Sequence, residues 1–242
     1  MISEKAILFE DQWLLAVDKP AGVVVHPTFR NPSGTLLDAV RAHAGGATFN
    51  LLGRLDKLTS GVVLLAKDRQ TYAALQRAWP HVEKDYLVVV DAIVEPQSGE
   101  IDLPLGTDPA DRRRRIVRPD GASSVTRFER LARDAGRSVL RCRPLTGRRH
   151  QIRVHLAARG WPVVGDRVYG RALEAFPRHA LHAWRVSFVH PATGAGVTIE
   201  AAVPENILKS VALYPNSDTV AGQCDTSVTG SAPRPRSHST FS

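Results

Sequence analysis

The chain of 242 residues is 43% hydrophobic and 23% charged, which is the composition of a folded protein with enough apolar material for a core. Its 32 Lys and Arg against 24 Asp and Glu leave a net charge of +8, and a basic folded body favours a polyanionic partner, most simply nucleic acid. The two cysteines, Cys142 and Cys224, argue against a disulfide scaffold and against a Cys-rich zinc or iron–sulfur site.

Targeting signals are the next feature that the sequence can exclude. Residues 1–5 carry no basic segment followed by an apolar signal core. No apolar run approaches the length of a membrane span. We therefore expect a cytoplasmic protein without a membrane segment, with a monomer as the default assembly.

The first 50 residues predict an extended arm followed by a short helix. Residues 7–18 alternate loosely between apolar and polar side chains, which is typical of a strand or a hairpin arm. Thr35 is a suitable N-cap for a helix over 36–43, which Gly45 and Gly46 would end.

A glycine-bounded loop, residues 53–61, places Asp56 between two cations, Arg54 and Lys57. The apolar run 62–67 follows at once and predicts a buried strand. A carboxylate on such a loop can serve in catalysis, because the strand fixes its position while the loop leaves it reachable. The alternative, from these residues alone, is a surface turn in which Asp56 pairs with Arg54 or Lys57.

The middle of the chain predicts a helix, a strand and a long basic excursion. Asp68 is a suitable N-cap for a helix that Pro80 would close, and residues 86–90 are rich in β-branched side chains that favour a strand. Residues 95–121 combine several Pro and Gly with the run Arg112-Arg113-Arg114-Arg115. An irregular connection of this length in a compact domain is usually functional or disordered.

The second half predicts an α+β fold. A helix is expected over 151–159, with Gly160 just past its end. Strands are expected over 123–131, 137–143, 182–189 and 197–202. Because strands outnumber helices and most connections suit antiparallel pairing, we expect a mostly antiparallel mixed sheet flanked by short helices and long loops. Residues 1–214 would form the folded domain, and the Ser/Thr/Pro-rich residues 215–242 a disordered tail.

A second dense segment, residues 145–156, combines three arginines with two histidines. Thr146 or the turn at Gly147 would open the helix here, so that free N–H groups and the arginines converge on one end and offer a site for phosphate or for a carboxylate. In such a helix His150 and Arg153 share a face. The alternative is a solvated basic helix start.

Other familiar chemistries find little support in the sequence. The pairs His150/His155 and His179/His182 lack the Glu or Cys neighbours of a zinc motif. No phosphate-binding or dinucleotide-type glycine pattern follows a strand, and no Gly-x-Ser-x-Gly elbow is present. We therefore expect no metal site.

Six segments, taken in order, resemble the RluA-type RNA pseudouridine synthases over about residues 10–204. They are residues 17–22 through His26-Pro27; Arg54-Leu55-Asp56 with Thr59-Ser60-Gly61; Lys84 with Tyr86; Gly147-Arg148 with residues 150–155; Gly165-Asp166 with Tyr169-Gly170; and residues 181–183 with His190-Pro191 and Thr193-Gly194. Each segment alone is weakly specific, whereas six in order at suitable spacing make a specific match.

The resemblance implies an isomerisation without a cofactor, in which a uracil within RNA is detached from its ribose, turned and rejoined through carbon. The family's essential aspartate falls on Asp56, which can act as a nucleophile or a base. Whether it attacks the ribose, attacks the base or removes a ribose proton stays open. The family's tyrosine falls on Tyr86, whose ring could stack on the uracil and whose hydroxyl could take part in proton transfer. Its arginine falls on Arg153, a guanidinium that would keep the aspartate ionised.

The resemblance also predicts a basic cleft that binds structured RNA, either rRNA or tRNA. Arg54 is expected to help bind RNA and to assist extrusion of the target uridine from its stack. The arginine run lies where relatives carry an RNA-gripping insertion. The predicted RNA-binding residues are Arg54, Lys84, Arg112, Arg113, Arg114, Arg115, Arg148, Arg149 and His150.

Three positions depart from the family's usual pattern. Gly53 stands where a His is usual, Arg149 where a small hydroxyl residue is common, and Leu58 where polar residues are frequent. The chain offers no room for an N-terminal S4 RNA-binding domain, so recognition is expected to fall to a stand-alone catalytic domain, residues 1–214.

Two alternatives to a pseudouridine synthase remain open. A non-catalytic RNA-binding or RNA-chaperone protein on the same fold would bind RNA without isomerising it. A carboxylate-dependent hydrolase would need a second acidic group beside Asp56, and only Asp166 is available for that role.

Overall fold

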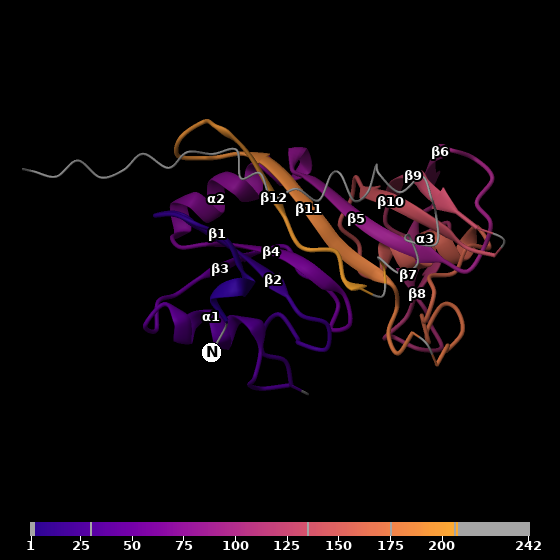
Figure 1. The fold of residues 1–242 in the computed structure, drawn as a ribbon, viewed down its shortest axis with the longest axis horizontal. Helices are drawn as coiled ribbons and strands as arrows, with labels where there is room; N and C mark the ends of the chain where they lie inside the picture. Colours follow the sequence, from indigo (N-terminus) through magenta and orange to yellow (C-terminus); the bar gives the residue numbers. More distant parts are fainter. Residues whose placement is uncertain (1–2, 30, 135, 175, 206, 208–242) are drawn as a thin grey trace, which may run out of the picture.

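The computed structural model describes residues 3–29, 31–134, 136–174, 176–205 and 207. Most of its strands join one mixed sheet that runs the length of the molecule (Figure 1). Its strands are β1 (Ile7–Glu10), β2 (Leu14–Lys19), β3 (Asn50–Leu52), β4 (Ser60–Ala66), β5 (Glu83–Val90), β6 (Ser98–Asp102), β9 (Val125–Arg133), β10 (Ser138–Pro144), β11 (Leu181–Val189) and β12 (Gly196–Glu200). The order is β1-β2-β4-β11-β5-β10-β9-β6, with β3 on β4 and β12 on β11. The α+β class and the mostly antiparallel sheet are therefore confirmed.

The N-terminal half of the sheet is buried on both faces. Alternate residues of β4 enter two different apolar clusters, Val63 and Leu65 on one side and Val62 and Leu64 on the other. Helix α1 (Leu36–His43) packs into the first cluster and α2 (Arg69–Ala78) into the second. A strand covered on both faces needs no polar alternation, which explains the continuous apolar run in its sequence.

The two predicted helix starts in this half are confirmed. Thr35 and Asp38 form a capping box at the start of α1, each satisfying a backbone N–H of the other. The Asp68 side chain accepts from Thr71 N at the start of α2. Pro80 does not close α2 directly, because a short 3-10 helix, Trp79–His81, carries the chain on to β5.

The C-terminal half of the sheet packs against the third helix, α3 (Gln151–Ala158). Ile152 and Leu156 of α3 enter one cluster with Leu140 and Cys142 of β10 and Val88 of β5. Residues 151–156 of α3 are all buried, so packing around the helix holds its N-terminus beside the centre of the sheet. The predicted site residues His150 and Arg153, at the start of α3, therefore lie beside the centre of the sheet as well.

The two halves meet where β4 pairs with β11 in parallel, at His182↔Ser60 and Ala183↔Gly61. Gly61 has φ +111°, and a Cβ there would lie 2.1 Å from the carbonyl oxygen of Ala183. Only glycine permits this approach of the two backbones. The loop that carries Asp56 ends at this junction and is fixed by it.

Two expectations for local structure were wrong. Residues 95–121 are not one irregular excursion: they contain β6 and a small hairpin of β7 (Leu105–Thr107) and β8 (Arg115–Val117). Helix α3 does not open at Thr146 or Gly147 but at His150, and the Thr146 hydroxyl donates to the Gln151 side chain instead. The tail predicted over 215–242 lies outside the described residues.

Candidate active site

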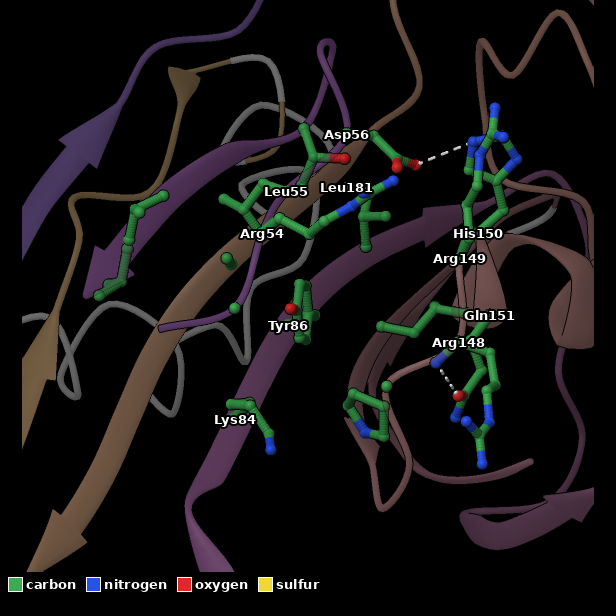
Figure 2. Close-up of a pocket in the computed structure, with 18 of the residues that line it drawn as sticks. Arg54, Leu55, Asp56, Lys84, Tyr86, Arg148, Arg149, His150, Gln151 and Leu181 are labelled. Carbon is green, nitrogen blue, oxygen red and sulfur yellow. Dashed lines mark hydrogen bonds and ion pairs between the residues drawn. The ribbon is translucent and has the colours of Figure 1, made fainter. Parts of the chain in front are cut away.

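A cleft of about 580 Å³ lies between the loop before β4, the middle of β5 and the start of α3. Figure 2 shows side chains from all three segments around it. Its lining includes all three predicted catalytic residues, Asp56, Tyr86 and Arg153, although 97 positions of sequence separate the first from the last. The loop, the strand and the helix bring them together because the sheet places all three elements at its centre.

Arg153 connects the loop carboxylate to a second, buried carboxylate. Its Nη1 donates to Asp56 Oδ2 at 3.0 Å, while its Nε and Nη2 donate to the two oxygens of Asp166 at 2.7 and 2.8 Å. The Asp166 side chain is fully buried, whereas that of Asp56 is 25% exposed. Bidentate pairing to Asp166 orients the guanidinium, so that its remaining nitrogen is aimed at Asp56.

The charge of Asp166 is stabilised where it lies. Burial raises the pKa of Asp166, but the hydrogen bonds and the charge of Arg153 outweigh burial, and the pKa lies below its ordinary value. Asp166 Oδ1 also accepts from the backbone N–H groups of Val168 and Tyr169 at 2.9 and 3.2 Å. With its acceptors used in this way, Asp166 is not the free second acid that a hydrolase would need.

A buried lysine holds the Asp56 loop from the other side. Lys19 has no exposed surface, and its Nζ donates to the carbonyl oxygens of Pro20, Val23 and Lys57 at 2.9, 2.8 and 3.2 Å. Burial, together with the charge of Arg178, lowers the pKa of Lys19 to about 8, against the opposite effect of Asp56. The lysine therefore ties the turn that follows it, residues 20–23, to Lys57, the residue after Asp56.

Two hydroxyl–imidazole contacts secure the end of the same loop. Thr59 Oγ1 lies 2.9 Å from His179 Nε2, and Ser60 Oγ lies 2.9 Å from His182 Nδ1. Burial lowers the pKa of both histidines to about 4, so both are neutral at neutral pH. The motif Thr59-Ser60-Gly61 thus works as a structural anchor of the loop onto β11.

Lys84 and Tyr86 lie in succession along β5 and line the floor of the cleft (Figure 2). Burial, and then the charge of Asp56, raise the pKa of Tyr86 to about 12, so the phenol keeps its proton at neutral pH. Lys84 Nζ lies 4.9 Å from the centre of the Trp79 ring. An aromatic ring and a cation therefore flank the same stretch of cleft.

The predicted RNA-binding residues separate into two groups. Six of them line the cleft: Arg54, Lys84, Arg115, Arg148, Arg149 and His150. The remaining three, Arg112, Arg113 and Arg114, belong to the β7–β8 hairpin loop outside the cleft lining. Within that loop Arg113 pairs with Asp111 at 2.9 Å and Arg114 lies 3.9 Å from Asp108.

Comparison with known proteins decides the family. Residues 13–158 match the model of the RNA pseudouridylate synthase family. The chain belongs to this family. It is 40% identical over 222 residues to ribosomal large subunit pseudouridine synthase D of Xanthomonas campestris, covering 83% of this chain and 66% of the relative. It is 38% identical over 215 residues to the uncharacterized RNA pseudouridine synthase YlyB of Bacillus subtilis, covering 85% of this chain and 71% of the relative.

Solved structures agree with this fold. Human RNA pseudouridylate synthase domain containing 1 superposes with a TM-score of 0.71 at 24% identity, covering 95% of this chain and all of that one. Human RNA pseudouridylate synthase domain containing 4 gives a TM-score of 0.69 at 22% identity, covering 86% and 92%. The RluA-type resemblance of the six sequence segments is confirmed. The chain spans about two thirds of the length of the synthase D relative from Xanthomonas campestris.

Gly53 stands where the family usually has a His, and its backbone conformation explains why this chain has a glycine there. Gly53 has φ +80°, and a Cβ there would lie 2.8 Å from Cζ2 of Trp79. The Trp79 ring thus occupies the space that a side chain at position 53 would need. Of the other two departures, Arg149 is exposed at the cleft, and Leu58 is partly exposed while its carbonyl oxygen accepts from Arg178 at 3.3 Å.

Three residues that support the cleft were not among the predicted site residues. Asp166 and Tyr169 belong to a segment that carried the family resemblance, which was the available signal, but their partners come from distant segments. Lys19 also lies in a matched segment, and nothing in the sequence showed that its ammonium is buried.

The described residues contain no group of three or more His, Cys, Asp or Glu side chains that could hold a metal ion. Across the same part of the chain, no helix is long and apolar enough to cross a membrane.

Proposed function

We propose that this chain isomerises specific uridines in structured RNA to pseudouridine, with Asp56 as the essential nucleophile or base. The observation that carries the proposal is a partly exposed carboxylate, held by Arg153, in a cleft lined by Tyr86. A cleft of about 580 Å³ is of the size that accepts a small ligand, and it suits one extruded nucleotide. Membership of the RNA pseudouridylate synthase family supports the same chemistry.

The isomerisation breaks the bond from C1′ of the ribose to N1 of the uracil and forms a bond from C1′ to C5. The hydrogen on C5 leaves and N1 gains one, so the reaction is balanced without an oxidant or a cofactor. Asp56 would attack or deprotonate, and Tyr86, protonated at neutral pH, would stack on the uracil and take part in the proton transfer. Arg153 would hold Asp56 in place through each step.

The substrate RNA is proposed from the relatives and from charge. Relatives from Xanthomonas campestris and Nitrosomonas europaea are named as large ribosomal subunit synthases, so large-subunit rRNA in the cytoplasm is the first substrate to test. The chain carries a net charge of +8, which favours binding to a polyanion. Arg54, Lys84, Arg148 and Arg149 would bind the RNA strand at the cleft, and the hairpin arginines Arg112–Arg115 would contact its phosphates.

The test uses RNA that carries tritium at C5 of its uracils. Because C5 loses its hydrogen when the new bond forms, isomerisation releases tritium into water, and sequencing then maps the modified uridine. We expect release with large-subunit rRNA, no release with Asp56→Ala of the same thermal stability, and no inhibition by EDTA. If the Asp56→Ala protein still released tritium, Asp56 would not be the essential nucleophile or base, and the proposed role would be wrong.

The main rival is an RNA chaperone on the same fold, which would bind these RNAs and release no tritium from any of them. The connected set Asp56–Arg153–Asp166 speaks against it. A buried charge network has a high energetic cost that RNA binding alone does not require.

A further inference from the structure

His150 has a backbone conformation that its sequence does not explain. It has φ +59° and ψ +14°, and no other described non-glycine residue has a positive φ. A left-handed conformation costs a residue with a Cβ about 1–2 kcal/mol, and such strain persists where the surroundings over-determine it, most often at functional sites. The imidazole makes no capping hydrogen bond to α3, so the strain does not serve the helix.

The imidazole of His150 instead has a partner on a distant loop. Its Nδ1 lies 2.7 Å from the hydroxyl of Tyr169. That hydroxyl accepts the backbone N–H of Arg115 at 2.8 Å. Among the described residues, Nδ1 is the one acceptor within reach of the tyrosine's own proton, so we assign Tyr169 as the donor to Nδ1. Burial, with the charges of Arg153 and Arg149, lowers the pKa of His150 to about 4 against the effect of Asp56, so the ring is neutral. A neutral ring that accepts at Nδ1 carries its proton on Nε2.

The Nε2–H group faces the catalytic carboxylate, and the dashed line in Figure 2 marks this contact. His150 Nε2 lies 3.6 Å from Asp56 Oδ2, the same oxygen that accepts from Arg153. This distance exceeds that of a direct hydrogen bond, so the N–H acts on the carboxylate through its partial charge. Among the described residues, no hydrogen bond reaches Asp56 Oδ1. The hydrogen bond from Arg153 and the partial charge of the His150 Nε2–H group thus both act on Oδ2, which leaves Oδ1 to the substrate.

The far end of this chain of contacts is the β7–β8 hairpin. Arg115 is the first residue of β8, and the guanidinium of Arg114 lies 5.8 Å from the centre of the Tyr169 ring. The arginine run of the hairpin loop is thus tied to Tyr169 by its backbone and by a ring contact. Any shift of the hairpin on RNA binding would therefore also displace Tyr169, the residue that orients the His150 ring.

We propose that His150 and Tyr169 are positioning residues that connect the β7–β8 hairpin to Asp56: Tyr169 fixes the ring of His150, whose Nε2–H holds Oδ2 so that Oδ1 faces the bound uridine. The proposal rests on the proposed function for its effect on rate, but not for the arrangement of protons, which the free protein possesses. It replaces the prediction that His150 is a direct RNA contact.

The first experiment needs no RNA. In protein with ¹⁵N-labelled histidine, NMR distinguishes the two neutral tautomers of each imidazole. We expect His150 in the Nε2–H form in the free protein, and a shift towards the Nδ1–H form or a mixture in Tyr169→Phe, which keeps the ring and removes only the hydroxyl. A protonated or Nδ1–H ring in the unaltered protein contradicts the proposal, whatever the enzyme's substrate.

The second experiment measures single-turnover tritium release at saturating RNA. We expect Tyr169→Phe to be slower by about 10-fold and His150→Gly by about 100-fold, the size of effect that a misplaced reacting group produces, with RNA affinity unchanged. Glycine suits φ +59°, which offsets part of the stability lost with the imidazole contacts, and thermal unfolding checks that His150→Gly is folded. Added imidazole should restore part of the rate of His150→Gly, and less in the double variant with Tyr169→Phe.

Arg149→Gly is the matched control, since it removes the neighbouring exposed cleft side chain. It should weaken RNA affinity and gain nothing from imidazole. If His150→Gly also weakens affinity and is not rescued, His150 is an RNA contact and the proposal is wrong. Inactivity of the unaltered protein would count against the proposed function instead, and the tautomer measurement would still decide the present proposal.

Discussion

Two regions of this molecule are rich in charge, and they use it differently. At the start of α3 the charges of Asp56, Arg153 and Asp166 are connected and largely buried, with the Arg153 side chain 6% exposed. In the β7–β8 hairpin loop the Arg113 side chain is 73% exposed and its partner is its own near neighbour Asp111. Buried pairs depend on every member, whereas exposed pairs contribute little to stability. The first region should therefore govern chemistry and folding, and the second should govern affinity for RNA.

The largest effect is expected from Arg153→Lys. A lysine keeps the charge but has a single nitrogen, so it cannot contact Asp56 and remain bidentate on Asp166. We expect a fall of about 10³-fold in the single-turnover rate, the upper end of the effect of removing one hydrogen-bond donor from a reacting centre. Tritium release at saturating RNA measures it, and Arg113→Lys in the hairpin loop is the control. If both substitutions lowered the rate equally and only slightly, the buried region would not govern the chemistry and the comparison would be wrong.

Next in size is the effect of Asp166→Asn on folding. The variant leaves the buried Arg153 guanidinium without its charge partner, which should lower the free energy of unfolding by about 3 kcal/mol. Asp111→Asn removes a carboxylate from the exposed pair of the hairpin and should hardly change stability. Urea denaturation of both variants gives the two values. A hairpin variant as unstable as Asp166→Asn would contradict the comparison.

Lowering the pH should reduce the free energy of unfolding through the buried histidines near the cleft, between about pH 6.5 and pH 4. Burial lowers the pKa of His179 and His182 to about 4, from about 6.5 in an unfolded chain. Between these values the unfolded state binds more protons, so the free energy of unfolding has its full value above pH 6.5 and falls as the pH drops towards 4, by about 3 kcal/mol for each histidine. Denaturation curves across this range measure the fall. His182→Gln should flatten part of it, and an unchanged slope in that variant would contradict the assignment.

The contribution of the hairpin arginines should be visible in the salt dependence of RNA affinity. Replacing Arg112 and Arg113 by Ala is expected to weaken RNA binding about 10-fold at low salt. It should also reduce the slope of log affinity against log salt by about 0.7–0.9 for each phosphate that the variant no longer neutralises. Filter binding over a salt series measures both quantities. An unchanged slope would show that these arginines do not bind phosphates.

The smallest effect concerns the apolar rim of the cleft. Gly53→Ala meets a left-handed backbone and the Trp79 ring together, whereas Gly194→Ala meets a backbone at φ +72° with open space around it. The backbone alone should cost about 1 kcal/mol in both variants, so any further loss of stability in Gly53→Ala measures the clash with the ring. Thermal unfolding compares them, and Trp79→Leu should remove the difference. Equal destabilisation of the two glycine variants would show that the ring moves freely.

Much of this molecule could be predicted from local sequence. Thr35 and Asp68 mark two helix starts because their side chains satisfy backbone N–H groups within three residues. The apolar run after Gly61 predicts a strand covered on both faces, and it is one. The family motif also pointed to Asp56 as a site residue without any knowledge of the structure.

Only the tertiary structure decided what surrounds Asp56. The opening of α3 was predicted at Thr146 or Gly147, but contacts to Tyr169 hold His150 in a left-handed conformation that no local pattern favours. The partner that Arg153 needs, Asp166, is brought to it by the turn after α3. These residues act through pairs that are far apart in sequence, and burial makes those pairs strong because it removes the competing water. Local sequence therefore determined most of the elements, and the resemblance to the family indicated Asp56, while packing determined the charge partners of that carboxylate.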